Sequence, residues 1–115
     1  MSAKSNKHRN KRVLCSDGII RASGREAARF EHLRLLERVG QISNLESQAV
    51  YDLVPSVRLD GRKKPAIRYV ADFRYTVGAA QIVEDCKSPH LRTNPVYRIK
   101  KHMMKHFFDI DILET

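Results

Sequence analysis

Residues 66–87 read AIRYVADFRYTVGAAQIVEDCK, and this stretch decides the fold. β-Branched and aromatic residues dominate it, which is typical of strands, and Gly78-Ala79 in its middle suits a tight turn. We therefore expect strands over 66–77 and 80–87. Two strands joined by such a short turn must pair antiparallel, so the stretch predicts a β-hairpin.

Two acidic residues would meet across this hairpin. The turn position places Asp72 roughly opposite Asp85 or its neighbour. Two carboxylates about 5 Å apart repel by roughly 3 kcal/mol at an effective dielectric near 20, and a divalent cation would remove that repulsion. Because alternate strand residues share a face, Lys87 should accompany Asp85, while Glu84 and Cys86 face the other way. A register error of one residue would exchange Glu84 with Asp85.

A helix is expected over 23–39, before the hairpin, because apolar residues recur there at helical spacing and Gly40 follows. On this helix Glu26 projects between Phe30 and Leu33, toward the sheet. The same glutamate fits a capping box in which Ser23 is the N-cap. Both a structural role at the helix end and membership of a site stay open for Glu26.

The other segments complete a mixed domain over 13–115. We expect a small hairpin (12–15 with 19–22), two more strands (42–45 and 49–54), a charged loop (58–65), an irregular stretch with two prolines (88–95), a second helix (96–108) and a short terminal run (109–114). This order indicates an α/β or α+β domain with helices packed on one sheet.

The length of 115 residues fits one domain. No stretch approaches the roughly 18 apolar residues of a membrane span, and no apolar signal segment opens the chain, so we expect no membrane partner. Two cysteines make no disulfide framework and lack metal-site spacing, which favours a reducing, cytoplasmic setting.

The net charge of +9 is distributed unevenly. It is +4 over 58–68, −2 over 69–86 and +6 over 87–105. Two basic blocks that flank an acidic one predict a polyanionic partner with an acidic site between the contacts. Residues 1–12 add a charge of +5 without any periodicity, and we expect them to form a disordered basic arm.

Five short motifs in order resemble the PD-(D/E)XK nuclease superfamily. They are Ser23 to Ala27, Val39 to Ile42, Tyr69 to Phe73, Glu84 to Lys87 and Tyr97 to Lys101. More narrowly, about residues 12–114 are similar to a small phage and prophage family of that superfamily, long labelled as a domain of unknown function. Ala71 stands where the superfamily carries proline.

The resemblance implies a restriction-endonuclease-like αβββαβ core, a central mixed sheet flanked by helices, and magnesium-dependent hydrolysis of DNA phosphodiester bonds, with Mn²⁺ as a substitute. Asp72 and Asp85 would bind the metal, joined by Glu26 and the Cys86 carbonyl. Lys87 would position or help deprotonate the attacking water and offset charge on the transition state. Gln48 would orient that water.

Basic side chains on both sides of the acids would then hold the DNA backbone: Arg62, Lys63, Lys64, Arg98, Lys100, Lys101 and Lys105. About six phosphate contacts predict a log-log salt slope near −5 for duplex binding. No segment looks like a base-reading module, so we expect selection of backbone or structure. By analogy with small phage junction resolvases, the substrate would be branched or recombination and replication DNA, in a bacterial host cell.

Cutting two strands would need two copies of so small a domain, which predicts a homodimer. Two alternatives stay open at this point. The first is a non-catalytic nucleic-acid-binding module, in which the acids are ordinary surface charges. The second is a small phage protein that binds a host protein, with its basic segments serving only solubility.

Overall fold

The computed structural model describes residues 12–115, so the arm expected over 1–12 lies, except for Arg12, outside the described residues. The elements in chain order are β1 (Val13–Leu14), β2 (Ile20–Arg21), α1 (Gly24–Arg38), β3 (Ser43–Val54), β4 (Val57–Leu59), β5 (Arg62–Lys64), β6 (Ile67–Val77), β7 (Ala80–Asp85), α2 (Pro89–Arg92), α3 (Pro95–Phe108) and β8 (Leu113–Glu114). The central sheet has the strand order β3-β6-β7-β8. Its pairs are antiparallel except the parallel pair β7–β8, so the sheet is mixed.

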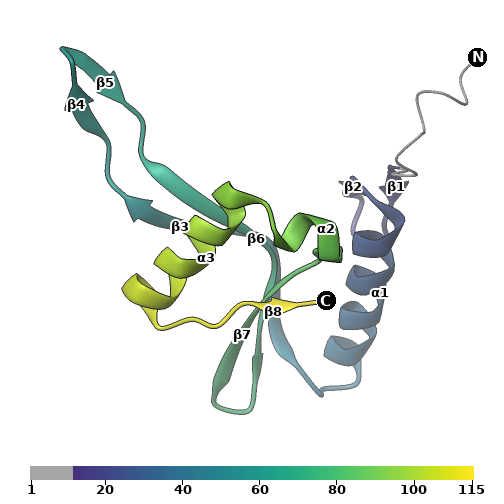
Figure 1. The fold of residues 1–115 in the computed structure, drawn as a ribbon. Helices are drawn as coiled ribbons and strands as arrows, with labels where there is room; N and C mark the ends of the chain where they lie inside the picture. Colours follow the sequence, from purple (N-terminus) through teal and green to yellow (C-terminus); the bar gives the residue numbers. More distant parts are fainter. Residues whose placement is uncertain (1–11) are drawn as a thin grey trace, which may run out of the picture.

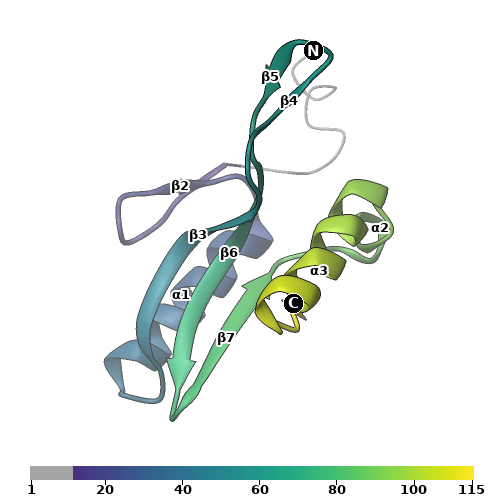
Figure 2. The same ribbon diagram turned by 90° about the vertical axis from the view of Figure 1, so that its left-hand side faces the viewer.

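Helices α1 and α3 lie on opposite sides of this sheet (Figure 1, Figure 2). Each helix covers its own apolar core. The α1-side cluster comprises Cys15, Ala27, Phe30, Leu33, Ile42, Phe73 and Tyr75. The α3-side cluster comprises Ala49, Tyr51, Leu53, Tyr69, Ala71, Val83, Tyr97, Met104 and Ile112. In β7 the neighbours Ile82 and Val83 pack into different clusters, as alternation along a strand requires.

This alternation is interrupted halfway along β6. Ala71 belongs to the α3-side cluster and Phe73 to the α1-side cluster, although residues two apart normally share a face. Gln48 of β3 lies opposite Asp72, between the pairs Ser47–Phe73 and Ala49–Ala71. Gln48 has a φ of 56°, in the left-handed region that non-glycine residues seldom adopt. Asp72 therefore lies at the point where the buried residues of β6 change from packing on the α3 side to packing on the α1 side.

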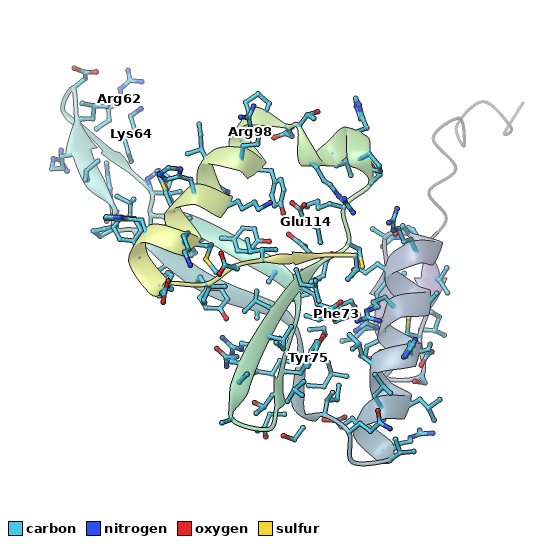
Figure 3. The ribbon with its side chains drawn as sticks, turned by 60° about the horizontal axis from the view of Figure 1, so that its bottom comes forward. Arg62, Lys64, Phe73, Tyr75, Arg98 and Glu114 are labelled. Atoms are coloured by element: carbon cyan, nitrogen blue, oxygen red, sulfur yellow. The ribbon has the colours of Figure 1, made fainter. Side chains whose placement is uncertain are left out.

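A buried charged network fastens α1 to the hairpin. Glu84 is fully buried and accepts hydrogen bonds from Arg29 Nε at 2.8 Å and Nη2 at 2.6 Å, and from the Tyr75 hydroxyl. A bidentate pair of this kind is the strongest hydrogen-bonded arrangement of an arginine and a carboxylate, and it compensates the buried negative charge of Glu84. Figure 3 shows Tyr75 and Phe73 between the sheet and α1.

The hairpin predicted over 66–87 is confirmed. Phe73 pairs with Glu84, and the same register sets Asp72 opposite Asp85. The helix expected over 23–39 is also confirmed as α1, with Ser23 as its N-cap. The fold is a mixed α+β domain in which helices pack on one mixed sheet, as the order of elements predicted.

Three predictions about local structure were wrong. The strands expected over 42–45 and 49–54 form one strand, β3, because left-handed residues at Asn44 and Gln48 break its apolar pattern without ending it. The loop expected over 58–65 is a hairpin, since both Asp60 and Gly61 have positive φ, as a two-residue type I′ turn requires. The stretch 88–95 contains the short helix α2, which Ser88 caps.

We predict that Arg29→Ala lowers the free energy of unfolding by about 3–5 kcal/mol, because it leaves the buried Glu84 carboxylate without its cation. Urea unfolding at pH 7 measures the change. The matched control is Arg25→Ala on the exposed side of α1, which should change stability by less than about 0.5 kcal/mol. Equal losses in the two variants would contradict the role given to the Arg29–Glu84 pair.

Candidate active site

Asp72 and Asp85 meet where β6 and β7 separate. Each carboxylate accepts a backbone N–H of the facing strand: Asp72 Oδ2 from Cys86 at 2.8 Å, and Asp85 Oδ1 from Asp72 at 3.3 Å. Asp85 is 1% exposed, and Asp72 is partly exposed. The juxtaposition expected from the turn position is therefore present, and it is held by main-chain groups that cannot rotate away.

The second oxygen of Asp85 faces the α3 side. Oδ2 accepts a hydrogen bond from the Tyr69 hydroxyl and lies 3.6 Å from Lys87 Nζ. Burial and the negative charge of Asp85 raise the pKa of Tyr69, so its hydroxyl stays a proton donor. Lys87 Nζ also lies 4.8 Å from the centre of the Tyr97 ring, a cation–π contact that holds the ammonium beside the acid.

Glu26 reaches the same region from α1. Its Oε2 lies 3.5 Å from Gln48 Nε2 and 4.0 Å from Arg21 Nε. Ser23 does cap the helix, since its Oγ accepts the Glu26 N–H at 3.2 Å. Only half of the predicted capping box is therefore present. Among residues 12–115 no hydrogen bond runs from the Ser23 N–H back to the Glu26 carboxylate, which instead lies at the pocket beside Gln48.

A pocket of about 300 Å³ connects these groups. Its lining includes Glu26, Gln48 and Asp72, together with Arg21 of β2. Asp85 does not line it and lies behind Asp72. A ligand in this pocket would thus meet Asp72 and Glu26 directly, and Asp85 only after a side-chain movement.

The charges of these acids are poorly compensated. Burial, and then hydrogen bonding to and repulsion by Asp85, raise the pKa of Asp72 to about 8. Burial also raises the pKa of Glu26; the charge of Asp85 adds to this effect, whereas Arg21 and Lys87 oppose it. At neutral pH the Asp72–Asp85 pair therefore needs either a proton or a cation.

The donor set fits a hard divalent cation by its chemistry. Carboxylate oxygens are groups that Mg²⁺ and Ca²⁺ prefer, and Asp72 and Glu26 supply them at one pocket, whereas Cys86 is not among the residues that line it. Within residues 12–115, however, no group of three or more His, Cys, Asp and Glu side chains is close enough to hold an ion jointly. Binding would require Glu26 to turn from Gln48 and Asp85 to exchange its contact with Tyr69.

Cys86 carries no sign of nucleophilic chemistry. Its side chain packs against the α1-side cluster, and its Sγ lies 3.4 Å from Thr115 Oγ1. Burial raises the pKa of the thiol, which disfavours the reactive thiolate. Cys15 is also a free thiol, so neither cysteine forms a disulfide.

The predicted backbone-binding residues fall into two groups. Arg62, Lys63 and Lys64 lie on a hairpin that projects from the body, whereas Arg98 and the three lysines lie on α3 (Figure 3). On α3, Lys101 pairs with Glu114 at 2.9 Å, and Lys105 pairs with Asp109 and Asp111. These two lysines would have to exchange a carboxylate for a phosphate.

Lys100 is the α3 cation that shares a groove with Lys87. It lines a groove of about 400 Å³ between β6 and α3, together with Lys87, Tyr69 and Arg68. The groove thus joins the Asp85 side of the candidate site to the basic face of α3. A polyanion in this groove would reach Lys87 without crossing the buried acids.

Two residues of the site escaped the sequence analysis. Tyr69 donates a hydrogen bond to Asp85. The only feature of the sequence that pointed to a role for Tyr69 was its position three residues before Asp72 in the same predicted strand. Arg21 is 2% exposed, is held by Asp17 at 3.0 Å, and its Nε has no hydrogen-bond partner among the described residues. Nothing in the local pattern of β2 marked Arg21.

Residues 5–113 match the family described as "Protein of unknown function (DUF1064)". The chain belongs to this family. No match was found among curated proteins or among solved structures. In the described part of the chain, none of the helices has the length and apolar character needed to span a membrane.

The raised pKa of Asp72 predicts how stability depends on pH without metal. Protonation of Asp72 contributes to the stability of the fold. This contribution is complete below the ordinary aspartate pKa of 3.8 and is lost as the pH rises through the pKa of about 8 that Asp72 has in the folded protein. Asp72→Asn removes that loss, so its free energy of unfolding should fall less between pH 5 and pH 9 than that of the unaltered protein. Urea unfolding in EDTA measures both profiles.

Asp52→Asn is the control, because Asp52 is an exposed acid in a surface pair with Arg68. Its pH profile should run parallel to that of the unaltered protein. If the Asp72→Asn profile also runs parallel, burial does not perturb Asp72 in the way described.

Proposed function

We propose that this protein is a divalent-metal-dependent DNA endonuclease that hydrolyses phosphodiester bonds. One observation carries the proposal: Asp72 and Asp85 are clamped together at the separating ends of two strands, with Lys87 Nζ 3.6 Å from Asp85. An under-compensated acidic pair beside an ammonium is the arrangement that metal-assisted phosphodiester hydrolysis uses.

The order of elements supports the same proposal. Apart from the small hairpins and α2, the chain runs α1, β3, β6, β7, α3 and β8. This is the αβββαβ order that the resemblance to PD-(D/E)XK nucleases implies. Asp72 comes from the second of the three consecutive strands and Asp85 from the third, which agrees with the motif positions.

The residues would divide the work as follows. Asp72, Asp85, Glu26 and the Cys86 carbonyl are the groups available to hold Mg²⁺ or Mn²⁺, and the bound ion would polarise the phosphate and lower the pKa of water. Lys87, kept in place by Asp85 and the Tyr97 ring, would orient the water and offset charge on the pentavalent phosphorus. Gln48, which lines the pocket, would donate a hydrogen bond to that water or accept one from it.

In the reaction the water oxygen forms a bond to phosphorus while the bond between phosphorus and the leaving deoxyribose oxygen breaks. The proton of the attacking water passes to solvent or to a neighbouring phosphate oxygen, and the leaving oxygen takes a proton from a solvent water. The cations of the groove and α3 would hold the flanking backbone, and two copies of the chain would cut two strands. Branched DNA, and a phage or prophage source, remain predictions from the resemblance alone.

We predict that Asp85→Ala abolishes cutting of supercoiled and branched DNA in Mg²⁺ but keeps or improves DNA binding, because it removes a ligand and a negative charge together. Gel assays measure cutting, and fluorescence anisotropy measures binding. Asp52→Ala, an exposed acid outside the site, should cut normally. A cutting activity that survives Asp85→Ala would refute the assignment.

Metal binding should also be visible without any substrate. At about ten times its Kd, Mg²⁺ stabilises the folded state by about 1.4 kcal/mol, which raises the Tm by roughly 5 °C in a domain of this size. The rise should be larger at pH 8 than at pH 5, where protons compete for Asp72. Thermal denaturation measures it, and Asp85→Asn should lose most of the rise. The same Tm with and without Mg²⁺ would count against a metal site.

A non-catalytic DNA-binding module is the second candidate. It is favoured by one specific observation: both Asp85 oxygens already have partners, Tyr69 and the Asp72 N–H, as they would in a purely structural role. The two candidates differ in the experiments above. A module would bind DNA, cut nothing in any metal, and show no Tm response to Mg²⁺.

A further inference from the structure

The hairpin formed by β4 and β5, which we call the arm (residues 57–64), projects away from the rest of the protein (Figure 1, Figure 2). All of its residues are exposed. It includes the apolar side chains of Val57 and Leu59, which are 51% and 55% exposed. A two-stranded ribbon standing free in solvent is marginally stable at best, so this arm is poorly explained as a part of the folded core.

The charges of the arm further destabilise its two strands in the absence of a binding partner. It carries Arg58, Arg62, Lys63 and Lys64 against one acid, Asp60. Arg58 and Lys63 stand directly opposite each other across the two strands, and like charges in that position destabilise a sheet. None of these cations forms a salt bridge within the described part of the chain.

We propose that the arm lies in the major groove of duplex DNA that flanks the cutting site. This inference rests on the proposed function and adds to it the substrate class, a duplex flank of defined length. The major groove is about 12 Å wide and admits a two-stranded β-ribbon. Cations on both faces of the ribbon would reach the phosphates on both walls, and Val57 with Leu59 would contact the apolar edges of bases.

The charge of the arm argues against a second copy of this chain as its partner. The exposed apolar surface next to the arm, formed by Val96, Ile99 and Ile67, is bordered by Arg68 and Lys100. A basic arm placed there would meet like charge. A polyanion instead removes the Arg58–Lys63 repulsion and releases counterions.

The arm sets the length of that flank. Twelve residues separate Asp60 at its tip from Asp72. At about 3.3 Å per residue they span at most about 40 Å. At 3.4 Å per base pair this corresponds to roughly 12 bp of duplex. DNA with a shorter flank would leave the arm without a groove.

The test measures binding of the full chain in EDTA, where nothing is cut. The probes are DNA forks with a fixed single-stranded end and duplex flanks of 6, 12 and 24 bp. We expect the affinity to rise at least tenfold from the 6-bp to the 12-bp flank and little beyond. The double variant Arg58→Ser with Lys63→Ser should lose most of this rise, and its salt slope should fall by about 1.8, for two lost phosphate contacts.

The matched control is Arg34→Ser with Arg38→Ser on α1, which removes the same charge and should keep the rise with flank length. Dimethyl sulfate footprinting gives the direct readout, because it modifies guanine N7 in the major groove. The unaltered protein should protect guanines in the distal part of the 12-bp flank, and the arm variant should not.

An affinity that does not depend on flank length, or the same footprint with and without the arm charges, would overturn the proposal. So would sedimentation showing that the arm variant only converts a dimer into monomers. The nuclease proposal fails separately: a protein that cuts nothing in Mg²⁺ could still show the flank dependence and the footprint in EDTA.

Discussion

The interruption of strand alternation at Gln48 and Asp72 is the constraint on which the rest of the structure depends. Upstream of it, β6 packs against α3 through Tyr69 and Ala71; downstream of it, the strand packs against α1 through Phe73. One long hairpin can therefore pack against two helices that lie on opposite sides of the sheet. Asp72 sits at the crossover, where neither helix covers it fully, so its carboxylate can face a pocket.

Because of this geometry, the two adjacent acids of β7 have different surroundings on opposite sides of the sheet. Glu84 points to α1, where Arg29 neutralises it with two hydrogen bonds, and it becomes a fastening of the core. Asp85 points to the α3 side, where it has a tyrosine hydroxyl, a main-chain N–H and an ammonium 3.6 Å away. The first acid is fully compensated. The second is paired with Lys87, but within the described residues Asp72 beside it has no cation of its own, so the two acids need either a proton or a bound cation at neutral pH.

The sequence predicted those parts of the site that depend on local periodicity. The turn at Gly78 placed Asp72 opposite Asp85, and alternation along β7 separated Asp85 from Glu84; both follow from spacing within one hairpin. It could not predict Tyr69 as a partner of Asp85, because simple alternation puts Tyr69 on the face of Phe73. Only the crossover at Asp72 brings the hydroxyl to the other side, and a left-handed glutamine in the neighbouring strand leaves no pattern in the chain.

The same limit applies to charge. Counted along the chain, residues 87–105 are the most basic block and 106–115 an acidic one. In the fold the acidic block turns back along α3, so that Glu114 pairs with Lys101 and Asp111 with Lys105. Charges that are separate in sequence thus cancel in space, and the helix presents mainly Arg98 and Lys100. Among residues 12–115 no acidic side chain forms a salt bridge with the arm. Its net charge of +3 is therefore not cancelled in this way, although the block 58–68 contains fewer cations than 87–105.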